Sequence, residues 1–140
     1  MKILLATDGS NHARKAVDYV IKHSAMLGDE PDLTLVHVQA RLPNRAAAAL
    51  SRAAVDRYYR DQAEKALAPA RRALTAKGIA FKEAKLFGDA GETIASLAAK
   101  GKFSLIVMGS RGMGGFGSIV LGSVAHKVLA SCKVPALIVR

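Results

Sequence analysis

The sequence predicts an α/β protein, a single domain over residues 1–140 with an open parallel five-stranded sheet and helices on both faces. Short apolar runs alternate with segments of helical periodicity along the whole chain, and this alternation predicts parallel strands joined by right-handed helical crossovers. The run from Leu33 to Val38 is nearly continuous, as expected of a strand covered on both faces. In such folds ligands bind at the carboxyl ends of the strands, where the strand order reverses. Thr7-Asp8 and Met108-Gly109 end two predicted strands at that edge.

The first two predicted strands flank a capped helix. Residues 2–7 form a short apolar run that ends at Asp8-Gly9-Ser10, a pattern typical of a buried strand that turns into a helix. Apolar residues from Ala13 to Leu27 recur at spacings of three and four, which predicts a helix with one buried face. Ser10 or Asn11 can cap its start. The second strand, residues 33–38, should be parallel and central.

The middle of the chain predicts one long helix followed by an edge strand. Residues from Ala46 to Lys77 are rich in Ala, Arg and Lys and form helices well throughout. Pro69 should kink this helix or divide it into two pieces, because an interior proline removes a hydrogen bond and clashes with the preceding turn. Gly78 closes the helix, and residues 79–87 alternate between apolar and polar, which is typical of a strand near the sheet edge.

The last part of the chain predicts two further helices and two strands. Residues 89–92, DAGE, resemble a capping box and predict a short helix that ends near Gly101. Residues 104–108 predict the fourth strand. After a glycine-rich stretch, a last helix begins near Ser123 and leads to a terminal strand, Ala136 to Val139.

Composition limits the classes of function. With 140 residues the chain can bury a substantial core without disulfides or metals. The lone Cys132 excludes an internal disulfide and a cysteine-rich metal site, and it favours a reducing compartment, so we expect a cytoplasmic protein. The apolar run at residues 3–6 is far shorter than a signal peptide, and no stretch approaches the length needed to cross a bilayer, so we expect no membrane partner.

The net charge of +10 makes phosphate-bearing ligands and nonspecific nucleic-acid contact electrostatically plausible. Stacking aromatics beside basic residues would favour single-stranded nucleic acid, and only Tyr58 and Tyr59, next to Arg57 and Arg60, have that pattern. We therefore do not expect specific nucleic-acid binding.

Glycines concentrate between Gly109 and Val124, in the stretch GSRGMGGFGSIVLGSV. Six of the twelve glycines lie here, namely Gly109, Gly112, Gly114, Gly115, Gly117 and Gly122. The stretch joins a predicted strand to a predicted helix. Because glycine lets backbone N–H groups approach a ligand closely, and a helix N-terminus adds unpaired donors and a favourable dipole, the stretch predicts a phosphate-binding loop.

The spacing inside this stretch is G-x2-G-x9-G-S, formed by Gly109, Gly112, Gly122 and Ser123. Together with the opening KILLATDGS, the LTLVHV and LIVMGSRG strands, the LGSVAHKVL helix and the final VPALIVR, it resembles the universal stress protein family, in its ATP-binding branch, over essentially the whole chain. The resemblance implies a Rossmann-like fold, similar to the adenine nucleotide alpha hydrolases, with strand order 3-2-1-4-5. It also implies a homodimer joined through residues 136–139, an edge strand whose unpaired groups invite pairing.

The resemblance further implies an ATP site built from strand ends and the start of the last helix. The adenine would lie near Ala6, Val38 and Met108. The ribose would meet Asp8, next to Thr7, and the Gly109 backbone. The phosphates would meet Gly112, Gly122, Ser123 and Val124, with Arg111 as a nearby cation. A divalent ion, Mg²⁺, would be held mainly by the phosphates, with no metal ligand from the protein.

Several of these residues also have structural interpretations. Asp8 can brace the turn before the first helix, and Ser123 can be an N-cap, roles that are compatible with ligand binding. His37 and His126 are interpreted as structural, because no acid or nucleophile forms a recognisable partnership with either. Gly114, Gly115 and Gly117 would make residues 113–121 a mobile flap between the two halves of the site.

Other nucleotide motifs fail on context. Gly112, Gly114 and Gly117 fit the dinucleotide pattern G-x-G-x-x-G, but no Asp or Glu occurs after Glu92 to bind a ribose, and G-x4-G-K-S/T is absent. We therefore expect an ATP-binding protein that acts in stress response and signalling through nucleotide-dependent binding rather than fast catalysis. Whether it is an enzyme stays open: the alternatives are a slow Mg-dependent ATPase and a nucleotide-independent dimeric interaction module.

Overall fold

A computed structural model describes residues 1–30, 32–113 and 121–140. In these residues five parallel strands form one sheet in the order β3-β2-β1-β4-β5, which confirms the expected order. The strands are β1 (Lys2–Ala6), β2 (Asp32–Gln39), β3 (Lys82–Phe87), β4 (Leu105–Gly109) and β5 (Ala136–Val139). The helices are α1 (Asn11–Lys22), α2 (Asn44–Ala48), α3 (Arg52–Ala76), α4 (Ala90–Lys100) and α5 (Ser123–Ser131).

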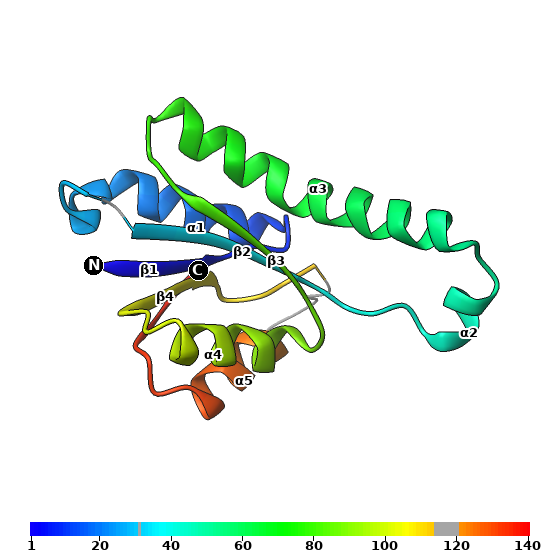
Figure 1. The fold of residues 1–140 in the computed structure, drawn as a ribbon. Helices are drawn as coiled ribbons and strands as arrows, with labels where there is room; N and C mark the ends of the chain where they lie inside the picture. The colour runs from blue at the N-terminus through cyan, green and yellow to red at the C-terminus, as the bar shows by residue number, and fades with distance from the viewer. Residues whose placement is uncertain (31, 114–120) are drawn as a thin grey trace.

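The helices cover both faces of the sheet, as predicted. Figure 1 shows α1 and α3 on one face and α4 and α5 on the other. Successive residues of β1 point to opposite faces, so Ile3 and Leu5 join one core cluster while Leu4 and Ala6 join the other. β2 is buried from Leu33 to His37, because helices cover both of its faces. The two clusters give the sheet a core on each side.

The first helix is shorter than the periodicity predicts. Ser10 is its N-cap, and the Ser10 hydroxyl accepts a hydrogen bond from the backbone N–H of Ala13 at 3.1 Å. The helix ends at Lys22, and a separate 3-10 helix, Ser24–Leu27, follows. Leu27 is nevertheless buried in the core. The apolar spacing therefore predicted the burial of Leu27 correctly, but not the change from an α-helix to a 3-10 helix.

The long helix is divided at a different place from the one predicted. The expected division at Pro69 was wrong, because α3 runs unbroken through Pro69. The division lies between Ala48 and Arg52, where Ser51 caps α3 by accepting a hydrogen bond from the Ala54 N–H at 3.1 Å.

Another element packs against α3 in the turn before Pro69. Proline has no N–H to donate to the carbonyl of Lys65 one turn earlier. The turn between β1 and α1 packs against that carbonyl: a Cβ on Gly9 would lie 3.2 Å from the Lys65 oxygen. The Thr7 hydroxyl also donates to the Ala66 carbonyl at 3.5 Å. Pro69 therefore lies where α3 meets another element rather than where it ends.

The other helix ends follow the predictions, whereas β3 begins at Lys82 and not at residue 79. Gly78 has φ +65° and closes α3, with its N–H donating to Thr75 O and the N–H of Ile79 donating to Leu74 O. β3 and β5 are the two edge strands, as expected. No helix among the described residues is long and apolar enough to cross a membrane.

Candidate functional site

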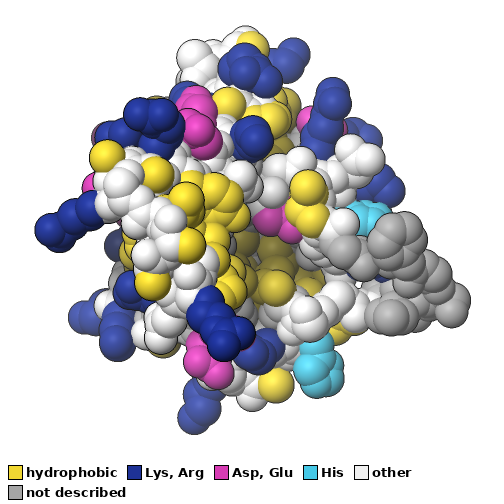
Figure 2. Space-filling model, turned by 90° about the vertical axis from the view of Figure 1, so that its right-hand side faces the viewer, with side chains coloured by type: hydrophobic (Ala, Val, Ile, Leu, Met, Phe, Trp, Pro, Cys, Tyr) yellow, Lys and Arg dark blue, Asp and Glu magenta, His cyan; other side chains and the backbone are white. Residues whose placement is uncertain are grey.

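A cavity of about 520 Å³ lies at the carboxyl ends of β1, β2 and β4. The strand order reverses between β1 and β4, so the cavity occupies the position where open α/β sheets bind ligands. All eleven residues expected at the site line it: Ala6, Thr7, Asp8, Val38, Met108, Gly109, Arg111, Gly112, Gly122, Ser123 and Val124. In Figure 2 this edge of the molecule is hollowed, and hydrophobic side chains line the hollow.

One half of the cavity is apolar. Ala6, Met108 and Val38 line it from the ends of three neighbouring strands, as expected. Ile94 and Ala90 face them from the first two turns of α4, and sequence reasoning missed both. The apolar spacing of the predicted helix placed Ile94 on its buried face. Only the folded chain shows that this face borders a cavity. Such a wall can hold a flat aromatic ring.

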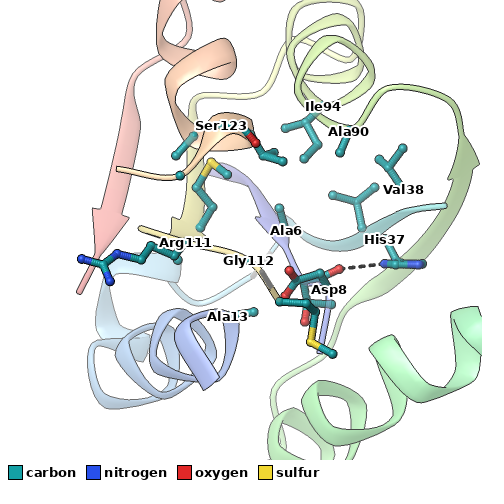
Figure 3. A pocket seen from close by; sticks show the side chains of 18 of the residues that line it. Ala6, Asp8, Ala13, His37, Val38, Ala90, Ile94, Arg111, Gly112 and Ser123 are labelled. Atoms are coloured by element: carbon teal, nitrogen blue, oxygen red, sulfur yellow. Dashed lines mark hydrogen bonds between the residues drawn. The ribbon is translucent and has the colours of Figure 1, made fainter. Parts of the chain in front are cut away.

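Asp8 supplies a carboxylate to the cavity and braces the adjacent turn. One carboxylate oxygen accepts the Ser10 N–H at 2.9 Å, so the structural interpretation of Asp8 is confirmed. The other oxygen, Oδ2, faces Gly112 so closely that a Cβ on that glycine would lie 2.7 Å from it. A side chain at position 112 would therefore displace the Asp8 carboxylate. Figure 3 shows the Asp8 side chain beside Gly112 at the cavity wall.

His37 is a further cavity residue that sequence reasoning interpreted as structural. Its side chain is buried at the end of β2, and its Nδ1 lies 3.0 Å from the Thr7 carbonyl oxygen. Because a carbonyl only accepts, Nδ1 carries the proton. The other ring nitrogen, Nε2, lies 3.2 Å from the side-chain amide group of Gln39. The Nδ1–H bond holds the end of β1, and with it the peptide that leads into Asp8, against β2 (Figure 3).

The start of α5 forms the other half of the cavity. Gly122, not Ser123, is the N-cap of this helix, so the N-cap interpretation of Ser123 was wrong. The Gly122 N–H donates to the Ser110 carbonyl at 2.7 Å and is thus already engaged. Ser123 and Val124 are the first residues of α5, whose N–H groups have no acceptor inside the helix. This half can therefore bind an anion through the start of the nine-residue helix.

Arg111 lines the cavity but does not point toward its apolar half. Figure 3 shows its guanidinium extending away from Asp8 and His37. Gly114, Gly115 and Gly117, and with them most of the expected flap at 113–121, lie outside the described residues. The described residues contain no cluster of three or more His, Cys, Asp or Glu side chains that could hold a metal ion.

An ion pair joins the two helices that border the cavity. Asp89 is the N-cap of α4, where it accepts the Glu92 N–H at 3.0 Å, and Lys127 of α5 donates to it at 2.7 Å. The Glu92 N–H and then the Lys127 ammonium lower the pKa of Asp89, and Asp89 in turn raises the pKa of Lys127. α4 and α5 also pack closely here, since a Cβ on Gly91 would lie 2.7 Å from the Lys127 Cβ.

Comparison with known sequences gives one consistent result. The profile of the universal stress protein family matches residues 1–140. A universal stress protein of Thermus aquaticus is 38% identical over 139 residues, which cover 99% of this chain and 97% of the relative. The universal stress protein YxiE of Bacillus subtilis is 31% identical over 147 residues, covering 99% of this chain and 98% of the relative.

Comparison with solved structures gives the same fold. The protein MJ0577 superposes with a TM-score of 0.77 at 26% identity, over 99% of this chain and 94% of that one. A universal stress protein in complex with cAMP has a TM-score of 0.72 at 23% identity, covering 100% of this chain and 97% of that chain. A universal stress protein from Archaeoglobus fulgidus in complex with dAMP has a TM-score of 0.69 at 19% identity, covering 100% and 98%.

Proposed function

Because the chain belongs to the universal stress protein family, we infer that its cavity binds an adenine nucleotide, with ATP and Mg²⁺ as the expected ligands. The observation that carries this inference is the composition of the cavity. Its apolar half and the N-terminus of α5, which can bind an anion, lie on either side of the Asp8 carboxylate. Its volume of about 520 Å³ lies within the usual range for ligand pockets. Structural neighbours that bind cAMP and dAMP support an adenine ligand.

The residues suggest how the nucleotide would be held. The adenine would pack between Ala6, Met108 and Val38 on one side and Ile94 on the other. The Asp8 carboxylate would accept hydrogen bonds from ribose hydroxyls, since an ionised carboxylate only accepts. The phosphates would lie at the start of α5, near the N–H groups of Ser123 and Val124 and the Ser123 hydroxyl. Bound phosphates would hold Mg²⁺.

We favour binding over fast turnover. Among the described residues that line the cavity, Asp8 is the sole carboxylate, and one of its oxygens already accepts the Ser10 N–H. His37, the sole histidine among them, has its Nδ1 proton committed to the Thr7 carbonyl. A general base placed for a water beside the phosphates is thus not evident in this part of the chain, and ATP hydrolysis should be slow. Nucleotide binding would then act as a signal in a stress response.

The edge strand β5 supports the further proposal of a homodimer. Ile106 donates to Pro135 O and Ser110 donates to Val139 O, so alternate residues of β5 bond to β4. The N–H groups of Ala136 and Ile138 therefore face away from β4, where a second copy could pair with them. If such a dimer forms without nucleotide, the alternative function is that of a dimeric interaction module that does not depend on nucleotide binding.

Isothermal calorimetry with ATP, ADP and AMP tests the proposal. We expect Asp8→Ala to weaken ATP binding strongly and Asp18→Ala to leave it unchanged, because Asp18 is an exposed carboxylate on α1 outside the cavity. Gly122→Val should also weaken binding, since even a Cβ there lies 3.1 Å from Arg111 Cα. Equal affinity in the wild type and Asp8→Ala would contradict the site. Fast Mg-dependent turnover would replace the binding function with an ATPase.

A further inference from the structure

Residues 40–61 form an arm that stands away from the body of the protein. It contains α2 and the first part of α3, and Figure 1 shows both projecting beyond the carboxyl ends of the strands. No residue from 38 to 62 is buried. The buried residues of α3 begin only at Ala63, and α2 has none. The arm thus contributes nothing to either core cluster.

A helix without tertiary packing has little stability of its own. Isolated helices shorter than about 12–15 residues are marginal in water. α2 has five residues and no side-chain cap bond, and the part of α3 that precedes Ala63 has a Ser51 cap but contributes no buried residue.

The base of the arm is anchored to the end of β3. The Tyr59 ring meets the Phe87 ring edge-on, with centroids 4.9 Å apart. The Tyr59 hydroxyl accepts the Leu42 N–H at 2.8 Å, and the Arg41 guanidinium lies 5.8 Å from the Phe87 ring centroid. These contacts fix the direction of the arm relative to the sheet.

The arm exposes apolar side chains beside basic ones. Leu50 is 47% exposed and Tyr58 is 38% exposed, and Phe87 at the base is 45% exposed. The arm carries five arginines and two aspartates, a net charge of +3. Figure 2 views the molecule from the side to which the arm projects and shows hydrophobic side chains gathered beside the hollow, with Lys and Arg side chains around them. Apolar and basic groups together complement an acidic amphipathic surface.

We propose that the arm is a docking surface for an acidic amphipathic helix of another protein. Leucine or aromatic side chains of that helix cover Leu50 and Tyr58, and its carboxylates meet arginines such as Arg57. The run Ala46 to Ala49 and the alanines at the start of α3 allow a helix to approach closely. This interaction needs no nucleotide, so it goes beyond the proposed function.

Two other occupants fit less well. A second copy of this chain also carries +10, so basic surfaces would have to meet. A single nucleic-acid strand binds through several free aromatic faces. The arm exposes one tyrosine, Tyr58, because Tyr59 is packed on Phe87 and hydrogen-bonded to Leu42. Aliphatic Leu50 offers no stacking face.

The probe is a fluorescein-labelled synthetic helical peptide with leucines on one face and glutamates on the other, and binding is read by fluorescence anisotropy on the full chain. We expect Leu50→Ser and Arg57→Glu each to weaken binding at least tenfold. The matched control is Leu129→Ser, because Leu129 on α5 is exposed to the same fraction, 47%, but lies outside the arm. Arg14→Glu is the matched charge control, on the exposed side of α1. Hydrogen exchange should show new protection confined to residues 44–61 when the peptide is added.

Several results would overturn the proposal. Equal losses in Leu50→Ser and Leu129→Ser would mean that the peptide has no preference for the arm. Equal binding of a peptide with lysines in place of glutamates would mean that the arginines of the arm do not take part. If a thymidine oligonucleotide displaced the peptide, and Arg57→Glu abolished oligonucleotide binding, the arm would be a nucleic-acid-binding surface instead. Self-association in sedimentation that disappears in Leu50→Ser would assign it to a second copy.

Discussion

Gly112→Ala should weaken nucleotide binding through Asp8 rather than through the phosphates. Gly112 is exposed, so an added methyl group should leave the core intact. Its Cβ would lie 2.7 Å from Asp8 Oδ2, whereas ordinary contacts begin at 3.4 Å. The carboxylate must therefore move by about 0.7 Å, enough to stretch a hydrogen bond of about 2.9 Å beyond its useful range. Losing one hydrogen bond to a charged group costs about 1.5–3 kcal/mol, which corresponds to a loss of roughly 10- to 150-fold in affinity.

Calorimetry on a double-mutant cycle separates this mechanism from a direct effect on the phosphates. In an Asp8→Ala background the carboxylate that collides with the methyl group is gone. Gly112→Ala should then have almost no further effect on the Kd for ATP, so the two changes should be strongly non-additive. The same loss of affinity with and without the Asp8 carboxylate would refute the reasoning and place Gly112 against the phosphates instead.

Three further predictions concern stability and assembly. Ser10→Ala should lower the free energy of unfolding, measured by urea titration, by about 1 kcal/mol. Ser51→Ala removes an N-cap hydrogen bond of the same length, 3.1 Å, in the arm and should lower it much less. Equal losses would mean that the arm is part of the cooperative core. Because the folded-state pKa of Asp89 is lowered, its stabilisation is present above pH of about 4 and is lost as the pH falls through the folded-state pKa. Asp89→Asn should therefore have a lower Tm than the wild type at pH 7, and a difference that persists unchanged at pH 2 would contradict this. Ile138→Pro removes an N–H that faces away from β4 and should give a monomer by light scattering, whereas Ile138→Val should stay dimeric; a dimer in both variants would place the interface elsewhere.

The alternation of strands and helices was predictable because it depends on local periodicity. Strand order and the layers of helices agree with the sequence-based expectation, as does the edge position of β3 and β5. Ser51 carried a usable signal, since serine is a preferred N-cap. That signal was outweighed by the helix-forming composition of the surrounding residues.

What the sequence could not predict depends on contacts between distant segments. Pro69 lies inside α3 at the place where Gly9 and Thr7 pack against the carbonyls of the preceding turn. His37 was interpreted as structural, and its bond to the Thr7 carbonyl agrees with that role, but its place in the cavity wall was not predicted because it depends on how β1 and β2 lie together. Ile94 was recognised as buried but not as a cavity residue, because α4 is positioned over the strand ends only by its packing on α5 and the sheet.

Mass spectrometry of the nucleotide released from freshly purified protein tests the proposed site most directly. The protein is denatured without added ligand, and the released small molecules are quantified against protein for the wild type, Asp8→Ala and the exposed-carboxylate control Asp18→Ala. We predict that the wild type and Asp18→Ala release ATP or a related adenine nucleotide, and that Asp8→Ala releases little. Release of equal amounts from Asp8→Ala, or of no adenine nucleotide from the wild type even after incubation with ATP and Mg²⁺, would contradict an adenine nucleotide site at the ends of β1, β2 and β4.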